Sequence, residues 1–203
     1  MKYGIFSVSL MFSIMSIVGC GGGGSSSNNG NTGGGSGGGP GDVTLTASGA
    51  VTGQFSGMMD FHYMEFDDVG VEGARWELSG HDSGADGGQS FSLTMAIESF
   101  VDGGESIGRP PVGDYDIGFE PNSDEVFSAI FTHIGEGGFM DTTEYASDMD
   151  SYTGTLTITE STADSVTGHF VADLFWEDYC TADGCVGDSI NINGSFTAQD
   201  RIQ

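Results

Sequence analysis

The sequence predicts an all-β protein, either an antiparallel two-sheet sandwich or a flattened barrel of about nine to eleven strands. From Asp42 onward, apolar side chains recur at every second residue, which is the period of a strand with one buried face. Short runs of Asp, Gly, Asn and Pro separate these segments, as turns separate strands. No stretch of about ten residues has the period of an amphipathic helix. Alternation with one polar face favours antiparallel pairing but does not choose between a sandwich and a barrel.

The alternating segments follow one another along the chain at 43–47, 51–55, 58–66, 74–78, 91–97, 126–134, 152–158, 166–176 and 190–198. They are rich in Thr, Val and aromatic residues, which suit a half-buried pleated surface. In segment 152–158 we expect Tyr152, Gly154, Leu156 and Ile158 on one face. Segments 58–66 and 126–134 are apolar on both faces. We therefore expect them to be central strands, with a cavity wall or a partner surface as the alternative.

A short pattern, [VI]-x-G-x-F-x-[AG], occurs at 51–57, 166–172 and 192–198. On a strand, its aliphatic residue, glycine, phenylalanine and small residue all point to the same face. The pattern predicts core packing in which the phenylalanine ring of one strand fills the space beside a glycine of a facing strand. A ligand groove lined by these glycines is the alternative. The irregular spacing of the copies excludes a solenoid.

The N-terminus has the pattern of a processed export signal. Met1-Lys2 is followed by an uncharged, largely apolar run at 4–18. This run is short of the roughly 20 residues that span a bilayer core, so it fits a signal peptide better than a membrane helix. It ends in Ile17-Val18-Gly19-Cys20, which resembles the lipobox of bacterial lipoproteins. The alternatives are an ordinary cleaved signal followed by a stray thiol, or an uncleaved anchor.

The lipobox resemblance implies that residues 1–19 are removed and that a diacylglycerol is attached to the Cys20 thiol. Gly21, rather than Asp, follows the cysteine. By the sorting rule of enteric lipoproteins, this resemblance implies an outer-membrane location in the cell envelope.

Residues 20–41 are predicted to be the lipidated cysteine and a flexible tether. Positions 21–41 hold no large apolar side chain, so the segment cannot offset the entropy of ordering. Its root-mean-square span is about 25 Å. A phosphate-binding glycine loop would follow a strand and precede a helix, and neither flanks this segment. Residues 42–203 then form a single acidic all-β domain.

The net charge of −26 excludes some partners. If Lys2 is removed, only Arg75, Arg109 and Arg201 oppose 30 carboxylates. Such a surface repels nucleic acid and anionic lipid headgroups. Membrane attachment is therefore expected through the N-terminal lipid.

The C-terminal half carries a second resemblance. Its segments at 152–159, 166–170 and 192–196, with a hairpin before the last, resemble uncharacterised β-rich domains of bacterial surface lipoproteins. The resemblance implies a fold and a location, and no activity. Within this half, Cys180 and Cys185 flank Thr-Ala-Asp-Gly between two strong strands. Export implies an oxidising compartment, so we predict a disulfide between them.

No catalytic, cofactor-binding or metal site is predicted from motifs. His62, His81, His133 and His169 have no metal-binding spacing, and the chain lacks a G-x-S-x-G elbow. With 30 acids, a pair of carboxylates is expected by chance. Calcium is an alternative in acid-rich loops at 82–86, 120–125 and 136–150, the last with Asp141, Glu144, Asp148 and Asp150.

Together these features predict a membrane-anchored extracytoplasmic lipoprotein that is not an enzyme and binds a protein or glycan at the cell envelope. One alternative is a β-barrel carrier of a small apolar ligand. Another is a structural envelope protein with loop calcium.

Overall fold

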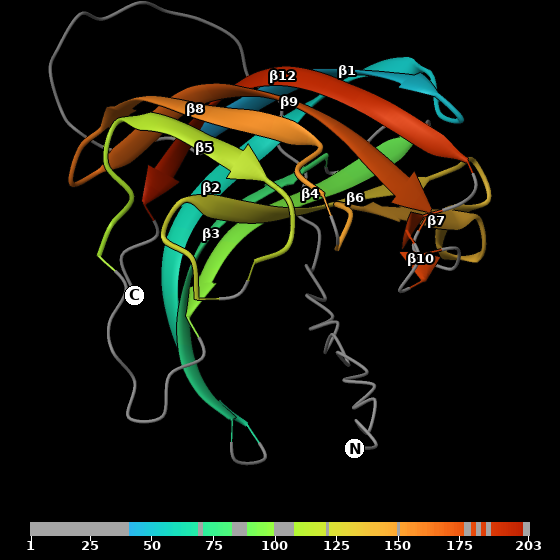
Figure 1. Cartoon of the computed structure of the whole chain (residues 1–203). Coiled ribbons are helices and arrows are strands. Elements are labelled where there is room, and N and C mark those ends of the chain that lie inside the picture. Colours follow the sequence, from blue (N-terminus) through green and yellow to red (C-terminus); the bar gives the residue numbers. More distant parts are fainter. Residues whose placement is uncertain are drawn as a thin grey trace, which may run out of the picture. The chain divides into compact units, whose positions relative to one another are not determined.

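The computed structural model describes residues 41–68, 71–82, 89–99, 108–120, 122–149, 151–176, 180–181, 184–185 and 188–200. Figure 1 shows the strands, which are β1 (Gly41–Gly49), β2 (Gly53–Asp68), β3 (Val71–His81), β4 (Ser90–Ser99), β5 (Gly113–Ile117), β6 (Val126–Ile134), β7 (Thr142–Ala146), β8 (Gly154–Ser161), β9 (Ser165–Trp176), β10 (Cys180–Thr181), β11 (Gly184–Cys185) and β12 (Ser189–Asp200). A single 3-10 turn, η1 (Gly138–Met140), precedes β7.

Nine of these strands close into a barrel. Their order around the wall is β1-β2-β3-β4-β6-β5-β8-β9-β12, and β12 pairs again with β1. The pairings are antiparallel except for β5 with β6 and a two-residue contact of β12 with β2. The all-β prediction is confirmed, and the open choice between sandwich and barrel resolves to a barrel. The physical reason is that β1 has partners on both sides, so this wall has no free edge there.

The predicted segments lie in strands, with three differences. Segments 51–55 and 58–66 merge into the single long strand β2. The first strand begins at Gly41, one residue inside the predicted tether. Tyr152 was expected on the same face as Leu156 and Ile158, which are buried, but β8 begins at Gly154 and the Tyr152 side chain is 56% exposed. The short strands β5 and β7 were not predicted, because each contains only two apolar side chains.

The barrel interior is a packed core of aromatic and aliphatic side chains. Phe55 on β2 contacts rings from β4 and β6, with ring centroids 5.6 Å from Phe91 and 5.8 Å from Phe131. These contacts fill the space between strands that are not neighbours in the wall. Segments 58–66 and 126–134 are thus core strands, with Phe61 and Phe131 fully buried. Because side chains fill its interior, the barrel encloses a packed core, as other small barrels do.

The glycine–phenylalanine pattern packs reciprocally where two copies meet. In the β9–β12 pair, Gly194 lies opposite Phe170 and Phe196 lies opposite Gly168. A Cβ on Gly194 would lie 2.7 Å from the Phe170 ring, and one on Gly168 would lie 2.9 Å from the Phe196 ring. Each ring therefore covers the glycine of the other copy, as the pattern predicts. The copy on β2 differs, because a Cβ on its glycine, Gly53, would lie 3.2 Å from the ring of Phe55 in the same copy.

Two short strands share one position in the wall. β5 pairs with β8 and with the start of β6, whereas β7 pairs with the rest of β6 and with the end of β9. We call the place where β5 ends and β7 ends the seam. There Ser147, only 8% exposed, donates from Oγ to the Gly118 carbonyl at 3.0 Å and accepts from the Ala129 amide at 3.1 Å. Ser147 thus joins the two part-strands to β6.

Replacing Ser147 by Ala is expected to lower the free energy of unfolding by about 2–3 kcal/mol, because it leaves a buried amide and a buried carbonyl without their partner. Urea denaturation followed by tryptophan fluorescence measures the change. Ser128→Ala is the matched control, since its hydroxyl makes one part-buried bond to the Ala96 carbonyl and should cost less than about 1 kcal/mol. Equal losses in the two variants would contradict the role of the seam.

An arginine covers one end of the core. The Arg109 guanidinium lies over the Phe61 ring at 4.8 Å and over Trp76 at 5.4 Å. Its Nη1 pairs with Asp200 at 2.5 Å, and its Nε donates to Ser161 Oγ at 3.2 Å. Arg109 therefore connects the segment before β5 to the last residues of β8 and β12. Its guanidinium group, paired with a carboxylate, covers the Phe61 and Trp76 rings at this end of the barrel.

Candidate functional site

The outer wall of β8, β9, β12, β1 and β2 carries two rows of side chains in register that include no Asp, Glu, Lys or Arg. The first row is Thr157–His169–Ser195–Thr44–Ser56, and the second is Thr155–Val171–Asn193–Thr46–Gln54. We call these ten positions the neutral field. They alternate with buried residues of the same strands, so they face outward, and eight of them are exposed while Thr155 and Thr157 are half-buried. Five adjacent strands make the field about 19 Å wide.

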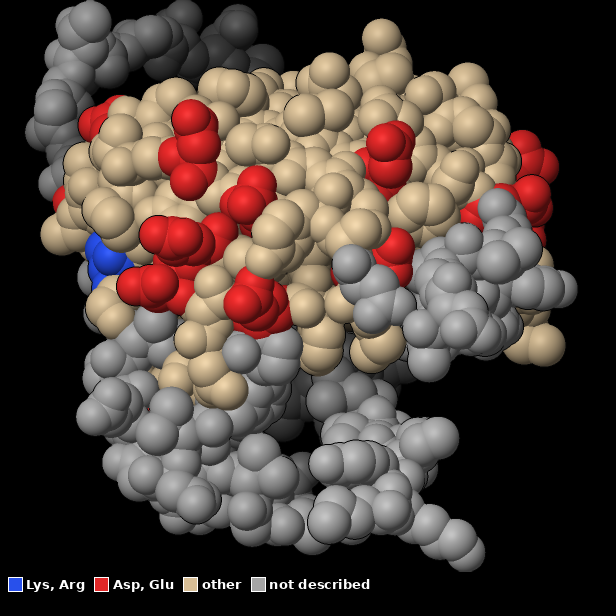
Figure 2. Space-filling view, viewed as in Figure 1, with Lys and Arg blue, Asp and Glu red and all other residues tan. Residues whose placement is uncertain are grey.

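The absence of charge in this field is unusual for the chain. The net charge is −26, and 30 of 203 residues are Asp or Glu. Carboxylates stand at its borders, with Asp114 and Asp116 on β5, Asp42 on β1 and Asp173 on β9. In Figure 2 the upper part of the view is largely tan, and most of the red lies lower. The field is therefore a neutral polar surface within an anionic one.

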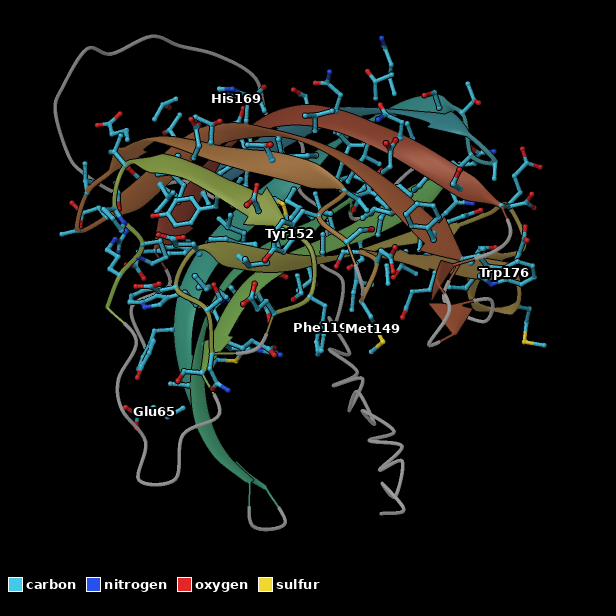
Figure 3. All side chains as sticks on the ribbon, in the orientation of Figure 1. Glu65, Phe119, Met149, Tyr152, His169 and Trp176 are labelled. Atoms are coloured by element: carbon cyan, nitrogen blue, oxygen red, sulfur yellow. The ribbon has the colours of Figure 1, made fainter. Side chains whose placement is uncertain are left out.

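A shallow hollow of about 670 Å³ lies over the field. Its walls come from β1, β2, β9 and β12 and include Thr44, Thr46, Gln54, Ser56, His169, Asn193 and Ser195. Figure 3 labels His169 on the upper, outer side of the wall. Among the described residues, few side chains of the field form a hydrogen bond with another side chain. The Thr44 and Ser195 hydroxyls lie 3.4 Å apart, and the Thr157 hydroxyl donates to the Asp114 carboxylate at 2.7 Å.

The chemistry of the field suits an uncharged polar ligand. Hydroxyl and amide groups both donate and accept hydrogen bonds, so they match the hydroxyl groups of a neutral polyol or sugar. An anionic ligand would gain no compensating cation here and would be repelled by the bordering carboxylates. A cationic ligand would be held better by the carboxylates outside the field. The hydroxyl, amide and imidazole groups of the field can all form hydrogen bonds with such a ligand.

A second polar cluster lies on the outer face of β2, β3 and β4. Arg75 pairs with Glu77 at 2.7 Å and with Glu98 at 3.5 Å, and His62 Nε2 lies 3.6 Å from Glu77. Burial raises the pKa of Glu98 above its ordinary value against the attraction of Arg75, and the Glu77 carboxylate raises it further. The hollow beside Glu98 has a volume of only about 10 Å³, about enough for one water molecule. The charged side chains of this cluster therefore pair with one another, and the hollow beside them is too small for a ligand larger than water.

Among the described residues, both arginines are paired with carboxylates: Arg75 in this cluster and Arg109 with Asp200. The unpaired charge of the described surface is accordingly negative.

The acid-rich loops do not bring ligands together within the described residues, where no group of three His, Cys, Asp or Glu side chains could hold a metal. Asp141 turns its carboxylate toward the Gly137 amide, at 3.5 Å, and Glu144 accepts from Thr132. Asp148 accepts from Ser151 at 2.7 Å. Asp150 and residues 83–88 lie outside the described part, so the calcium alternative would depend on them.

The two late cysteines lie opposite each other in the backbone. Cys180 and Cys185 are Cα partners in the antiparallel pair of β10 and β11. Partners of this kind lie within the Cα separation that a disulfide spans. Their side chains are outside the described part, and the disulfide stays a prediction. Cys20 and the whole of residues 1–40 are outside it too.

The neutral field was not predicted from sequence motifs, because none of its residue types by itself identifies a binding site. A usable signal existed in the outward positions of segments 152–158 and 190–198, which are Thr, Asn and Ser without a single acid. Only strand pairing shows that these positions join those of β1 and β2 in one surface.

Comparison with known proteins adds no family to this description. No protein-family model, no curated protein and no solved structure matches the chain. Within the described residues, no helix has the length and apolar character that crossing a membrane requires. The function is therefore argued from the residues of this chain.

Proposed function

We propose that this protein is an extracytoplasmic lipoprotein, anchored to the outer membrane through Cys20, whose barrel is a non-enzymatic binding domain for a neutral polysaccharide of the cell envelope. The observation that carries the binding function is the neutral field. Ten adjacent outward positions on five strands hold no Asp, Glu, Lys or Arg, although the chain carries 30 acids.

The anchor and the tether fit this kind of binding. The field contains no Phe, Tyr or Trp ring, so each contact with a sugar relies mainly on hydrogen bonds that compete with water and is weak by itself. A polymer with repeated units meets many copies of the protein on one membrane, and simultaneous contacts raise the overall affinity. A tether with a span of about 25 Å lets neighbouring domains orient toward the same polymer.

The carrier alternative shares the closed barrel but has less support from its interior. A carrier needs a lined cavity, whereas the described lumen is filled by contacting rings and one of its ends lies beneath Arg109. The neutral field lies outside the wall and needs no opening of the barrel.

Placing a carboxylate in the field is expected to weaken binding to neutral polysaccharides. Affinity electrophoresis of the purified protein through gels containing dextran, glucomannan or xyloglucan should show retardation, and alginate should give none. Thr46→Asp and Ser195→Asp are expected to weaken retardation by about tenfold, because the new charge must be desolvated against sugar hydroxyls.

The matched control is Ser48→Asp, which adds the same charge on the same strand and face, one outward position beyond the field. It should migrate like the other variants without polysaccharide and bind like the unaltered protein. If no neutral polysaccharide retards the protein, or if Thr46→Asp and Ser48→Asp bind equally, the proposed ligand class is wrong.

A further inference from the structure

The seam presents exposed apolar side chains from two loops. Phe119 follows Gly118 in the β5–β6 loop, and Met149 and Tyr152 belong to the β7–β8 loop. Their side chains are 40%, 63% and 56% exposed, respectively. The hydrogen bond from Ser147 to Gly118 joins the two loops at their roots. Figure 3 labels Phe119 and Met149 below Tyr152 in this view, and the Tyr152 ring lies against Gly118, the residue before Phe119. We call these three residues the seam patch.

The Tyr152 ring is held in a fixed position with one side open. Its Cδ1 would lie 2.7 Å from a Cβ on Gly118, so the ring rests on the backbone at a place where only glycine fits. Its hydroxyl donates a hydrogen bond to the Glu120 carboxylate. The Thr153 amide donates to the Ile117 carbonyl at 2.8 Å, which fixes the backbone beside the ring. A ring positioned in this way presents its free face to solvent.

Carboxylates surround this ring. The pKa of Tyr152 is raised, first by the hydrogen bond to Glu120 and then by the negative charges of Glu120, Asp116 and Glu125. Phe119 and Glu120 also line the small hollow that contains Glu98. The apolar surface of the seam patch is thus bordered by the carboxylates of Asp116, Glu120 and Glu125, and the two described arginines are paired with other acids: Arg109 with Asp200, and Arg75 with Glu77 and Glu98.

From this arrangement we propose that the seam patch docks a basic segment of a partner polypeptide, one in which Arg or Lys alternates with apolar side chains. The guanidinium or ammonium group lies over the open face of Tyr152 and pairs with the surrounding carboxylates. The apolar neighbours of that cation cover Phe119 and Met149. Charge complementarity selects this occupant, since a second copy of the chain would bring its own excess of carboxylates to the same place. The strong negative field of the domain steers such a partner and makes binding dependent on salt.

Fluorescence anisotropy of a labelled Arg-Leu-Arg-Leu-Arg amide, titrated with the purified protein, tests the proposal. Tyr152→Ala and Phe119→Ser are each expected to weaken binding about five- to tenfold, and Tyr152→Phe, which keeps the ring, should have a smaller effect. A Gln-Leu-Gln-Leu-Gln amide should not bind. Met140→Ala and Glu160→Gln, which remove an exposed apolar group and an exposed acid elsewhere, should change affinity less than twofold.

Circular dichroism verifies that each variant is folded. Equal affinity of Tyr152→Ala, Phe119→Ser and the unaltered protein would show that the peptide responds only to net charge, and would overturn the proposal. A dimer that dissociates in Tyr152→Ala would overturn it by assigning the patch to self-association. Thr46→Asp separates this inference from the polysaccharide function, because it should leave peptide binding unchanged whether or not the neutral field binds sugar.

Discussion

Cells that express the Cys20→Ser variant are expected to lose both palmitate labelling of this protein and its recovery with the membrane fraction. The thioether to diacylglycerol forms on a cysteine thiol, and a serine hydroxyl at position 20 does not accept it. Without the acyl chains, which contribute about 0.8 kcal/mol per buried methylene, nothing in the acidic chain attracts it to an anionic membrane. Metabolic labelling with palmitate, followed by membrane fractionation, gives the result directly.

The other two cysteines provide the control for this experiment. Cys180→Ser and Cys185→Ser should keep full labelling and full membrane recovery, because both lie far along the chain in the β10–β11 pair. A Cys20→Ser variant that remains labelled and sediments as before would refute the lipid anchor. The outer-membrane location and the role of the tether would then lose their basis as well.

A valine in place of Gly194 is expected to lower the free energy of unfolding by about 2–3 kcal/mol and the melting temperature by about 5–10 °C. Its Cβ would lie 2.6 Å from the Thr44 carbonyl oxygen, 2.7 Å from the Phe170 ring and 2.8 Å from the Leu45 Cβ. The ring belongs to a packed core and the carbonyl to the β1–β12 pair, so neither has room to move. Differential scanning calorimetry measures the loss.

Gly113→Val is the matched control, because Gly113 also lies in a strand of the barrel but has no atom within 4 Å of an added Cβ. There, valine should be neutral or slightly stabilising, since it favours the extended backbone more than glycine does. Adding Phe170→Leu to Gly194→Val should recover part of the stability by removing the ring that the new side chain meets. A loss of the same size at both glycines would mean that backbone entropy, rather than the ring, explains it.

The period-two pattern predicted the long strands well because each has a buried face that only one alternation satisfies. Phe91, Leu93, Met95 and Ile97 on β4 are all buried, as their spacing requires. Tyr152 was misplaced because it continues the same spacing beyond the end of β8, where Gly118 and Glu120 hold it outside. β5 and β7 were missed because each contains only two apolar side chains, which do not define a period. These two short strands complete the barrel wall by occupying one strand position together, β5 beside β8 and β7 beside β9.

The candidate site was less predictable than the strands. The sequence shows that Thr, Ser and Asn occupy outward positions, but the neutral field exists only because β8, β9, β12, β1 and β2 are neighbours in register. Those neighbours come from opposite ends of the domain, since β1 begins at Gly41 and β12 ends at Asp200. Likewise, Arg109 was visible as one of few cations, but not as the cover of the Phe61 ring.

The amino-acid sequence was sufficient for the all-β class, for most strand positions, for the ring-over-glycine packing and for the acidic character, because each follows from local spacing or composition. The tertiary structure was needed to show a closed barrel instead of a sandwich, a filled lumen, the neutral field and the seam patch. These features depend on which strands pair and in what register. Pairing across more than a hundred residues is decided by the packing of the whole core, which no local pattern contains.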